Sequence, residues 1–280
     1  MKDFVLYNGV TIPAIGLGTW QVQGEACYNA CKYAIEAGYN HIDTAYVYEN
    51  EVEVGKALID MGVKREEIFI TSKLPADIKT YDGAIEYFNR SLEGLKTDYL
   101  DLYLIHAPWP WSDVGGDYTE GNIECWKALI DLYNQKKIRA IGVSNFHVKD
   151  IEAITNATGF KPMVNQIRFF IGNTQENITK YCQDNDILIQ AYSPLATGEM
   201  LRIDVMDSLV EKYNTTKAKL CIAYCLQRGC QVLPRSTNQE RIKSNFEIDV
   251  VIDDEDMEYL KEHASPEKLE IIKYIFEGFH

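Results

Sequence analysis

Short apolar runs recur along the chain and alternate with longer stretches in which apolar residues are spaced as on one face of a helix. Eight such runs read IGLGTW, YNHID, IFITSKL, LDLYLIH, AIGVSNF, MVNQI, ILIQAYS and QVLP, at residues 15–20, 39–43, 68–74, 100–106, 140–146, 163–167, 187–193 and 231–234. Helical spacing occurs at 26–38, 50–62 and 83–95, and Gly38 and Gly62 suit left-handed helix caps. Strands that alternate with helices predict parallel pairing through right-handed crossovers.

Eight strand-helix units predict a closed (β/α)8 TIM barrel, preceded by a β-hairpin. FVLY and TIPAI flank Asn8-Gly9, a dipeptide that supplies the positive φ angles of a tight turn. The length of 280 residues is near the ~250 typical of the barrel, and no linker divides the chain, so we expect one domain over residues 1–280. The rival, an open doubly wound sheet, would need a G-x-G-x-x-G turn that IGLGTWQVQG lacks.

Composition and charge narrow the class of protein. The net charge of -14 and the pI near 4.8 disfavour binding to nucleic acid or to anionic membranes. No run approaches the ~18 apolar residues of a spanning helix, and MKDFVLYNGV lacks the features of a secretory signal, so we expect a cytoplasmic protein. Seven cysteines without CxxC spacing predict reduced thiols and no metal site. We expect a monomer that binds a small molecule.

Polar side chains stand at the carboxyl ends of the predicted strands, where the loops of a (β/α)8 barrel form its active site. They are Asp43, Lys73, His106, Ser144, Asn145, Gln166, Tyr192 and Ser193. Taken singly, a strand-terminal Asp is often a helix cap, a Lys is usually solvated and a His is more often structural. Their convergence on one rim indicates a functional site.

Eight ordered motifs give the chain a resemblance to the aldo-keto reductase family. They are GLGTW, DTAYVY, SKL, LIH, GVSNF, NQ, AYSPL and PRSTNQERIKSNF, and with the hairpin they extend to Phe246. The resemblance implies an enzyme that reduces aldehydes and ketones with a nicotinamide cofactor. It also implies four catalytic residues, Asp43, Tyr48, Lys73 and His106.

Elementary chemistry supports these four roles. Hydride addition to a carbonyl leaves an alkoxide that needs a proton donor, and the Lys73 cation is expected to lower the Tyr48 pKa from ~10. An ion pair with Asp43 would keep a buried Lys73 charged. His106 can hydrogen-bond the substrate oxygen and orient it. Tyr46 has no such role and is expected to pack.

The resemblance also implies the cofactor contacts. Amide and hydroxyl groups match the nicotinamide carboxamide, and an aromatic ring suits the nicotinamide face, which is the part expected of Tyr192. Other members of the set would line the pyrophosphate and the adenosine half. The full set is Gly18, Thr19, Trp20, Ser144, Asn145, Gln166, Tyr192, Ser193, Leu195, Thr197, Arg235, Ser236, Arg241 and Asn245.

Two arginines near the last strand predict NADPH as the cofactor. Arg235 and Arg241 can bind the 2′-phosphate bidentately, and the segment enters a helix whose N-terminus suits phosphate. Glu240 lies between them and could hold ribose hydroxyls instead. Within the family, Lys is common where this chain has Arg235, which keeps the charge, and Glu is common where it has Ser244, which leaves one adenosine-side contact open.

The substrate pocket is expected to be lined by Trp20, Val47, Trp109 and Trp111. Many family members have the tryptophan of an H-W-P motif where this chain has Ala107, so one wall of the pocket differs. The tail after Phe246 is short, and its last part, 265–280, has mostly helical spacing. We expect small polar aldehydes, ketoaldehydes or sugar-derived ketones as substrates.

Two other functions fit the same fold, because a fold does not fix function. The first is a binding subunit that senses the redox state of nicotinamide without turnover, although the four intact candidate residues oppose it. The second is an aldolase in which Lys73 forms a Schiff base. Loss of NADPH with an aldehyde would favour the reductase, and borohydride trapping at Lys73 would favour the aldolase.

Overall fold

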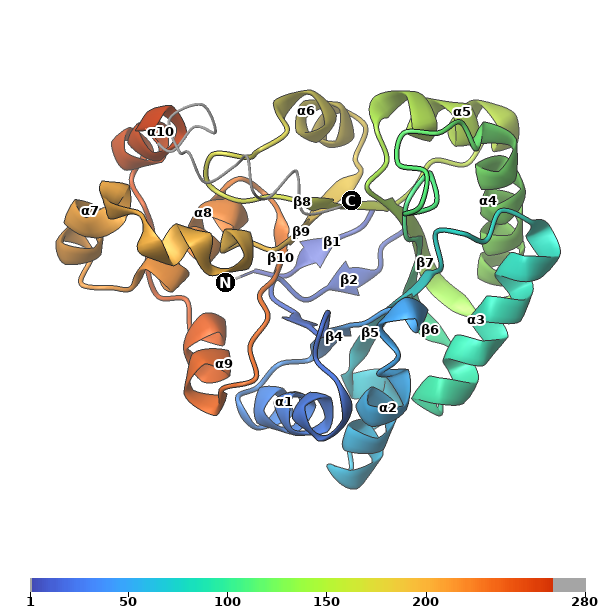
Figure 1. The fold of residues 1–280 in the computed structure, drawn as a ribbon, viewed down its shortest axis with the longest axis horizontal. Coiled ribbons are helices and arrows are strands. Elements are labelled where there is room, and N and C mark those ends of the chain that lie inside the picture. Colours follow the sequence, from blue (N-terminus) through green and yellow to red (C-terminus); the bar gives the residue numbers. More distant parts are fainter. Residues whose placement is uncertain (1, 264–280) are drawn as a thin grey trace.

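The computed structural model describes residues 2–263, which form a barrel of eight parallel strands surrounded by helices (Figure 1). The strands are β3 (Leu17–Gly18), β4 (His41–Asp43), β5 (Phe69–Leu74), β6 (Leu100–Ile105), β7 (Ile138–Ser144), β8 (Val164–Arg168), β9 (Leu188–Tyr192) and β10 (Gln231–Leu233). Neighbours in sequence pair in order from β3 to β10. The barrel closes where Ile15 pairs with Val232 in parallel, supported by a 2.9 Å hydrogen bond from the Gly16 N–H to the Val232 carbonyl. The predicted barrel is therefore confirmed.

Helices follow each strand and cover the outside of the barrel (Figure 1). They are α1 (Gly24–Glu36), α2 (Glu51–Asp60), α3 (Tyr81–Leu95), α4 (Thr119–Asn134), α5 (Val148–Thr158), α6 (Glu176–Asp184), α7 (Asp207–Lys212), α8 (Lys217–Gln227), α9 (Gln239–Phe246) and α10 (Asp254–His263). Short 3-10 turns lie at Tyr46–Tyr48, Arg65–Glu67, Ala196–Arg202 and Asp204–Met206. Gly38 and Gly62 have φ angles of 97° and 65°, which confirms both predicted left-handed caps.

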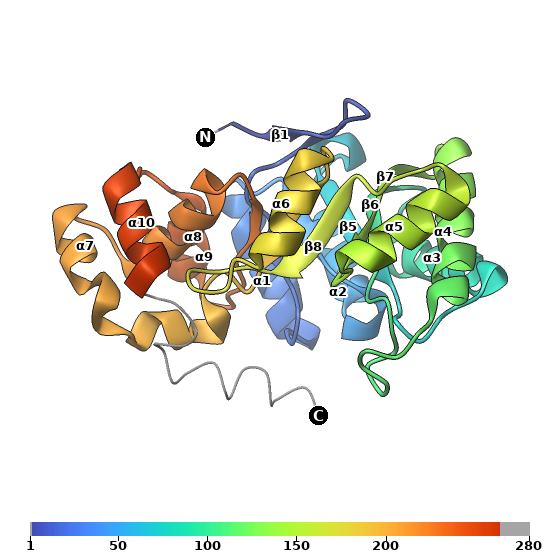
Figure 2. The same ribbon diagram turned by 90° about the horizontal axis from the view of Figure 1, so that it is seen from above.

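The N-terminal hairpin pairs β1 (Phe4–Val5) with β2 (Thr11–Ile12) in antiparallel register. Its loop bonds to segments that precede or begin strands: the Tyr7 hydroxyl donates to the Lys161 carbonyl, and the Asn8 amide donates to the Arg139 carbonyl. Figure 2 shows the hairpin along one edge of the molecule. The hairpin therefore covers the amino ends of the strands and leaves their carboxyl ends open.

The turn inside the hairpin differs from the expected one. Gly9 has a positive φ of 85°, whereas Asn8 does not, so the prediction of two positive φ angles was wrong. Asn8 instead accepts a hydrogen bond from the Val10 N–H and bridges to β7 with its amide nitrogen. The loop between β1 and β2 is therefore longer than a two-residue turn, and the Asn8 side chain stabilises it. In this longer loop Asn8 does not need a positive φ.

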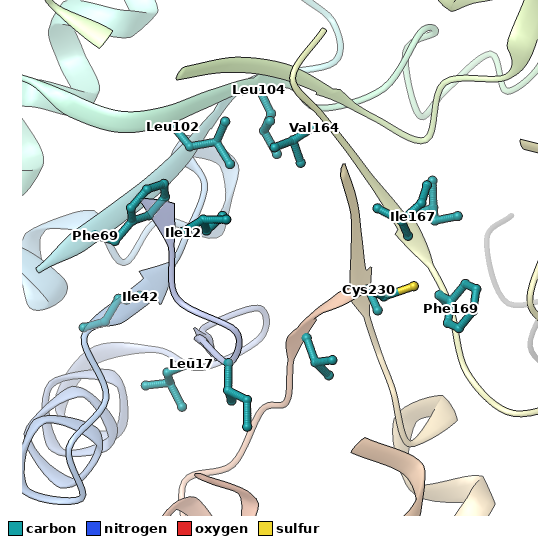
Figure 3. Packing of buried hydrophobic residues seen from close by; sticks show 14 of the residues in the cluster. Ile12, Leu17, Ile42, Phe69, Leu102, Leu104, Val164, Ile167, Phe169 and Cys230 are labelled. Carbon is teal, nitrogen blue, oxygen red and sulfur yellow. The ribbon is translucent and has the colours of Figure 1, made fainter. Parts of the chain in front are cut away.

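Strand residues are buried on both faces because helices cover the outside and side chains fill the interior. Figure 3 shows part of this apolar core, with Leu102 and Leu104 of β6 near Val164 of β8. One interior layer is polar: His41 lies between Thr71 and Gln231, with ring nitrogens 2.9 and 3.2 Å from their side chains. Gly16 makes room for that ring, since a Cβ there would lie 2.6 Å from His41 Nδ1.

The structure also bears on the sequence predictions about cysteines, metal ligands and membrane-spanning helices. All seven cysteines lie in the described part of the chain and have buried, free thiols. Within residues 2–263, no group of His, Cys, Asp or Glu side chains is arranged to hold a metal ion. Over the same range, every helix is too short or too polar to cross a bilayer. The helical spacing predicted at 265–280 lies outside the described residues.

Candidate active site

Four predicted catalytic residues come together at the carboxyl ends of β4, β5 and β6. Asp43 is the last residue of β4, Lys73 lies near the end of β5, and His106 directly follows β6. Tyr48 ends the 3-10 turn that follows β4. The parallel register explains the convergence, since it pairs β4 with β5 and β5 with β6. All four side chains lie at the open end of the barrel.

Asp43 and Lys73 form a buried ion pair. Lys73 Nζ lies 2.6 Å from Asp43 Oδ1 and donates a second hydrogen bond of 2.7 Å to the Thr44 carbonyl. Gln166 Nε2 donates to the other carboxylate oxygen of Asp43 at 2.7 Å. Burial raises the pKa of Asp43 and lowers the pKa of Lys73, and the contact between the two groups opposes both shifts. The geometry is that of a charged pair with its polar atoms satisfied.

Tyr48 is the candidate proton donor, and Lys73 Nζ lies 4.9 Å from its ring centroid. Burial first, then the negative charge of Asp43, raises the pKa of Tyr48 well above its ordinary value. This corrects the expectation that Lys73 lowers that pKa, because desolvation of the phenol outweighs the effect of a cation that Asp43 already pairs. Tyr48 therefore keeps its proton over the working pH range. An alkoxide is a stronger base than a phenolate, so the proton transfer remains favourable.

His106 stands beside Tyr48 with ring centroids 5.6 Å apart and planes at 71°. Burial, followed by the charge of Lys73, lowers the pKa of His106 well below its ordinary value, so the ring is neutral. Its Nδ1 is buried and has no hydrogen-bond partner among the described residues. A neutral imidazole carries one N–H and can donate it to a carbonyl oxygen without adding charge.

A second polar cluster lies on the adjoining strands β7, β8 and β9. The Asn145 amide donates to the His106 carbonyl at 3.1 Å and to Ser144 Oγ at 3.0 Å. The Tyr192 hydroxyl donates to Asn145 Oδ1 at 2.9 Å, and the Ser144 hydroxyl donates to the Gln166 carbonyl at 2.9 Å. Asn145 has a positive φ of 60°, which turns it back over this cluster. The three predicted carboxamide-binding residues and Tyr192, the predicted stacking residue, are thus adjacent to the four candidate catalytic residues.

Gln190 is a site residue that the sequence prediction missed. It is fully buried on β9, and its Oε1 accepts a 2.6 Å hydrogen bond from Gln166 Nε2. Gln166 Nε2 therefore donates to both Asp43 and Gln190, which leaves its amide oxygen available as an acceptor. A period of two places Gln190 on the same strand face as Tyr192, so an amide inside the apolar run ILIQAYS was the signal.

The loop after β3 is held against β4 by Thr19, which belongs to the predicted cofactor set, and by Asn50 and Thr44, which had no predicted role. Thr19 donates to the Asp43 carbonyl from both its N–H and its hydroxyl, at 3.1 and 3.0 Å. Asn50 is fully buried and donates from its amide to the carbonyls of Thr19 and Val22. Thr44 in turn donates to Asn50 Oδ1 at 2.6 Å. Gly18, at the end of β3, is bonded to the Pro234 carbonyl at 3.0 Å. These contacts fix the predicted cofactor segment 18–20 beside Asp43.

The segment after β9 has an unusual backbone. Ser193, Ala196 and Thr197 have positive φ angles of 53°, 48° and 58°. Ser193 and Leu195 are half-buried and Thr197 is exposed. Non-glycine residues adopt this conformation at a cost, and strained residues of this kind cluster at functional sites, which agrees with a binding loop here.

The predicted phosphate segment follows β10 and enters α9. Arg235 is exposed and donates to the Gln21 carbonyl at 3.1 Å, which ties the segment to the loop after β3. Arg241 is exposed in the first turn of α9, but its N–H donates to the N-cap side chain of Asn238. That N–H is thus already used, so the phosphate would rely on guanidinium groups. Ser236 accepts from the Asn238 N–H, and Asn245 is buried.

Aromatic and apolar side chains are exposed near this site. Trp20, Val47 and Trp111 are 37%, 41% and 37% exposed. The Trp111 ring lies 5.7 Å from the His106 ring, and the half-buried Trp109 lies 5.2 Å from Trp111, both edge to face. Tyr46, in contrast, packs edge-on against Tyr87 at 4.8 Å, as the sequence predicted.

The donor set fits a nicotinamide. Hydroxyl and amide groups from Ser144, Asn145 and Gln166 gather beside an aromatic ring, Tyr192, which are the groups that bind a carboxamide on a flat heterocycle. Gln166 retains an amide oxygen that can accept from a carboxamide NH2. The combination of this cluster with a Tyr, a Lys, an Asp and a His on one barrel rim defines an oxidoreductase of the (β/α)8 class.

Comparisons with known proteins agree with the site. Residues 14–265 match the model of the aldo/keto reductase family. The chain is 42% identical over 261 residues to glyoxal reductase of Bacillus subtilis, covering 92% of this chain and 91% of that protein. It is 39% identical over 262 residues to a 9,11-endoperoxide prostaglandin H2 reductase of Trypanosoma cruzi, covering 92% and 89%. The crystal structure of MGS-M4, an aldo-keto reductase from a deep-sea metagenome library, superposes with a TM-score of 0.88 at 36% identity, covering 94% and 95%.

The chain belongs to the aldo/keto reductase family. It is an oxidoreductase that interconverts carbonyl groups and alcohols with a nicotinamide dinucleotide, NADH or NADPH.

Proposed function

We propose that the protein reduces small aldehydes and ketones with NADPH and that Tyr48 donates the proton. One observation carries this assignment: Lys73 Nζ lies 2.6 Å from Asp43 and 4.9 Å from the Tyr48 ring, with His106 against the same ring. No other part of residues 2–263 combines a phenol, a buried cation and a neutral imidazole in this way. The nicotinamide supplies the hydride when it is bound.

Each side chain then has a defined task. His106 donates its N–H to the substrate oxygen and so orients the carbonyl carbon toward the hydride donor. Tyr48 transfers its phenolic proton to the alkoxide that hydride addition leaves. Lys73 stabilises the phenolate that remains, and Asp43 keeps Lys73 charged despite its burial. Ser144, Asn145 and Gln166 would hold the carboxamide, with Tyr192 against the ring.

A Tyr48→Phe variant tests the proton donor. It should lose about 100- to 10,000-fold in kcat for glyoxal or benzaldehyde, since that is the range for a positioned acid. NADPH affinity, measured by quenching of protein fluorescence, should be unchanged. Tyr46→Phe is the matched control, because Tyr46 sits two residues away and packs on Tyr87. Near-native turnover by Tyr48→Phe would remove Tyr48 from this role.

The aldolase alternative requires a Lys73 amine that is neutral and reachable by a ketone. The observed Lys73 is fully buried and donates to Asp43 and to the Thr44 carbonyl. This is the geometry of a protonated amine, which has no free lone pair to attack a ketone. Incubation with a ketone and borohydride should therefore leave Lys73 unlabelled in a tryptic map. Labelling there would replace the reductase assignment.

The preference for NADPH is proposed from the exposed guanidinium groups of Arg235 and Arg241. In a chain of net charge -14, a dianionic 2′-phosphate needs local cations, and planar guanidinium groups bind phosphate oxygens bidentately. We expect a higher kcat/KM for NADPH than for NADH. Arg241→Ala should reduce that ratio by about tenfold, the effect of one charge-assisted hydrogen bond.

Lys243 is the matched control for this test. It is exposed on the same helix and approaches Glu247 at 4.0 Å. Lys243→Ala should leave the NADPH to NADH ratio unchanged. A wild type that favours NADH, or an Arg241→Ala variant with an unaltered ratio, would count against the assignment.

A further inference from the structure

A partly buried lysine outside the catalytic group bonds to the backbone that follows His106. Lys79 lies between β5 and α3, and its Nζ donates to the Ala107 carbonyl at 3.0 Å and to Asn122 Oδ1 at 2.7 Å. Ala107 and Pro108 are the first two residues after His106. A long cationic side chain from a neighbouring loop therefore reaches the point where the catalytic strand passes into the substrate loop.

Asn122 completes the arrangement from the other side. It is buried in the first turns of α4, and its Nδ2 donates to the Pro108 carbonyl at 2.8 Å. The two consecutive carbonyls after His106 thus each accept one hydrogen bond, one from Lys79 and one from Asn122. We call these two side chains and the carbonyls of Ala107 and Pro108 the loop anchor.

The backbone around the loop anchor is built for close approach. A Cβ on Gly121 would lie 2.6 Å from the Lys79 Cβ and 2.9 Å from the Lys79 carbonyl oxygen. Glycine at this position therefore allows the start of α4 to approach Lys79, which brings Asn122 within reach of both partners. The loop anchor therefore lies where the start of α4 packs directly against the loop between β5 and α3.

Burial lowers the pKa of Lys79 to about 8. Cys125, Asp77 and Asp150 face it and oppose that shift, in that order, and the Tyr118 ring centroid lies 6.0 Å from its Nζ. A cation that is partly removed from water and directed at uncharged carbonyl and amide oxygens loses hydration, which its hydrogen bonds must replace. The pairing is not a surface ion pair.

The residues directly beyond the anchor form the aromatic wall of the site. Trp109 and Trp111 contact each other edge to face, and Trp111 contacts His106. Farther along, the Tyr118 hydroxyl donates to Asp113 Oδ2 at 2.9 Å and closes the loop. The two hydrogen bonds therefore hold the start of the segment that carries both tryptophans.

We propose that Lys79 and Asn122 are positioning residues that fix the Trp109 and Trp111 wall beside His106 and so set the affinity for carbonyl substrates that carry a flat aromatic group. The proposal rests on the reductase function above and deepens it. A two-carbon dicarbonyl such as glyoxal can accept a hydrogen bond from His106 but has no ring to pack against the wall. An aromatic aldehyde such as benzaldehyde is large enough to contact both.

Steady-state kinetics of Lys79→Met, which keeps length and removes every donor, test the proposal. KM for benzaldehyde should rise about tenfold, the effect of one lost hydrogen bond, while KM for glyoxal and the Kd for NADPH stay within about twofold. Lys79→Arg should retain most of the wild-type KM because it keeps donors. Lys127→Met is the control, since Lys127 is exposed on α4 and pairs with Glu124.

A double variant distinguishes a loop anchor from a general structural contact. If Lys79 acts through the wall, Lys79→Met combined with Trp111→Ala should have the benzaldehyde KM of Trp111→Ala alone. Additive changes, or equal changes for benzaldehyde and glyoxal, would overturn the proposal. Asn122→Asp keeps the acceptor for Lys79 and loses the donor to Pro108. It should raise KM for benzaldehyde by less than Lys79→Met does. It also provides a test if Lys79→Met does not fold.

A second readout is independent of turnover. In protein labelled with fluorotryptophan, the fluorine resonances of Trp109 and Trp111 should shift or broaden in Lys79→Met, while those of Trp20 and Trp126 stay in place. Unchanged Trp109 and Trp111 resonances would overturn the loop anchor even if the enzyme is active. Failure of the wild type to oxidise NADPH with either aldehyde would instead contradict the reductase function. The fluorine spectra would still show whether Lys79 positions the two tryptophans.

Discussion

The Asp43–Lys73 pair gives the sharpest stability prediction, because both groups are buried and the charge of one depends on the other. The two side chains are 5% and 0% exposed. Asp43→Asn keeps the volume but removes the negative charge and leaves one acceptor oxygen where Asp43 has two, one for Lys73 and one for Gln166. Lys73 would then be a buried cation with only neutral partners.

The expected loss follows from the cost of an uncompensated buried charge. Removing one partner of a buried pair costs about 3–5 kcal/mol in the free energy of unfolding. Without Asp43 the pKa of Lys73, already lowered by burial, should fall further, because the contact with Asp43 is the main effect that opposes this shift. Lys73→Met should cost a similar amount, since it strands Asp43. The double variant replaces the pair by neutral groups and should be much closer to wild type.

Urea unfolding of the four proteins at pH 7, followed by fluorescence and circular dichroism, measures this double-mutant cycle. The coupling is confirmed if the two single variants together lose more free energy of unfolding than the double variant loses. Folding lowers the Lys73 pKa, so the unfolded chain binds more protons between the folded pKa and the unfolded pKa of about 10.4. The stability of Asp43→Asn should therefore rise with pH over that window. Single variants that lose less than about 1 kcal/mol each, and whose losses simply add, would refute the reasoning.

Two further predictions concern the histidines. His106→Gln should lower kcat/KM more for bulky ketones than for small aldehydes, because orientation matters most when a substrate can bind in several poses; equal losses across a carbonyl panel would contradict an orienting role. For His41, burial and then Lys73 lower the pKa from 6.5 to about 3, so the unfolded chain binds a proton that the folded state excludes. Stability is therefore complete above pH 6.5 and falls toward pH 3, by roughly 4–5 kcal/mol, and His41→Gln should flatten that slope in acid unfolding.

The order of apolar runs and helical stretches was enough to predict the barrel and to place most of the candidate catalytic residues on one rim. Eight apolar runs separated by helical spacing left few ways to pair strands, and a barrel brings the carboxyl ends of all strands to one rim. Asp43, Lys73 and His106 could therefore be placed together because each stands at or beside a strand end. The glycine caps at Gly38 and Gly62 were readable for a similar reason, since a positive φ is a local property of one residue.

The effects of these groups on one another depend on distances and burial, which the folded structure establishes. The direction of the Tyr48 pKa shift depends on the balance between desolvation and two opposite charges, and a sequence contains neither burial nor distance. Gln190 joined the site because β9 is in register with β8, and Lys79 reached the loop after His106 because Gly121 lets α4 approach it. Such contacts join residues that are far apart in the chain, so packing, and not spacing along the sequence, establishes them.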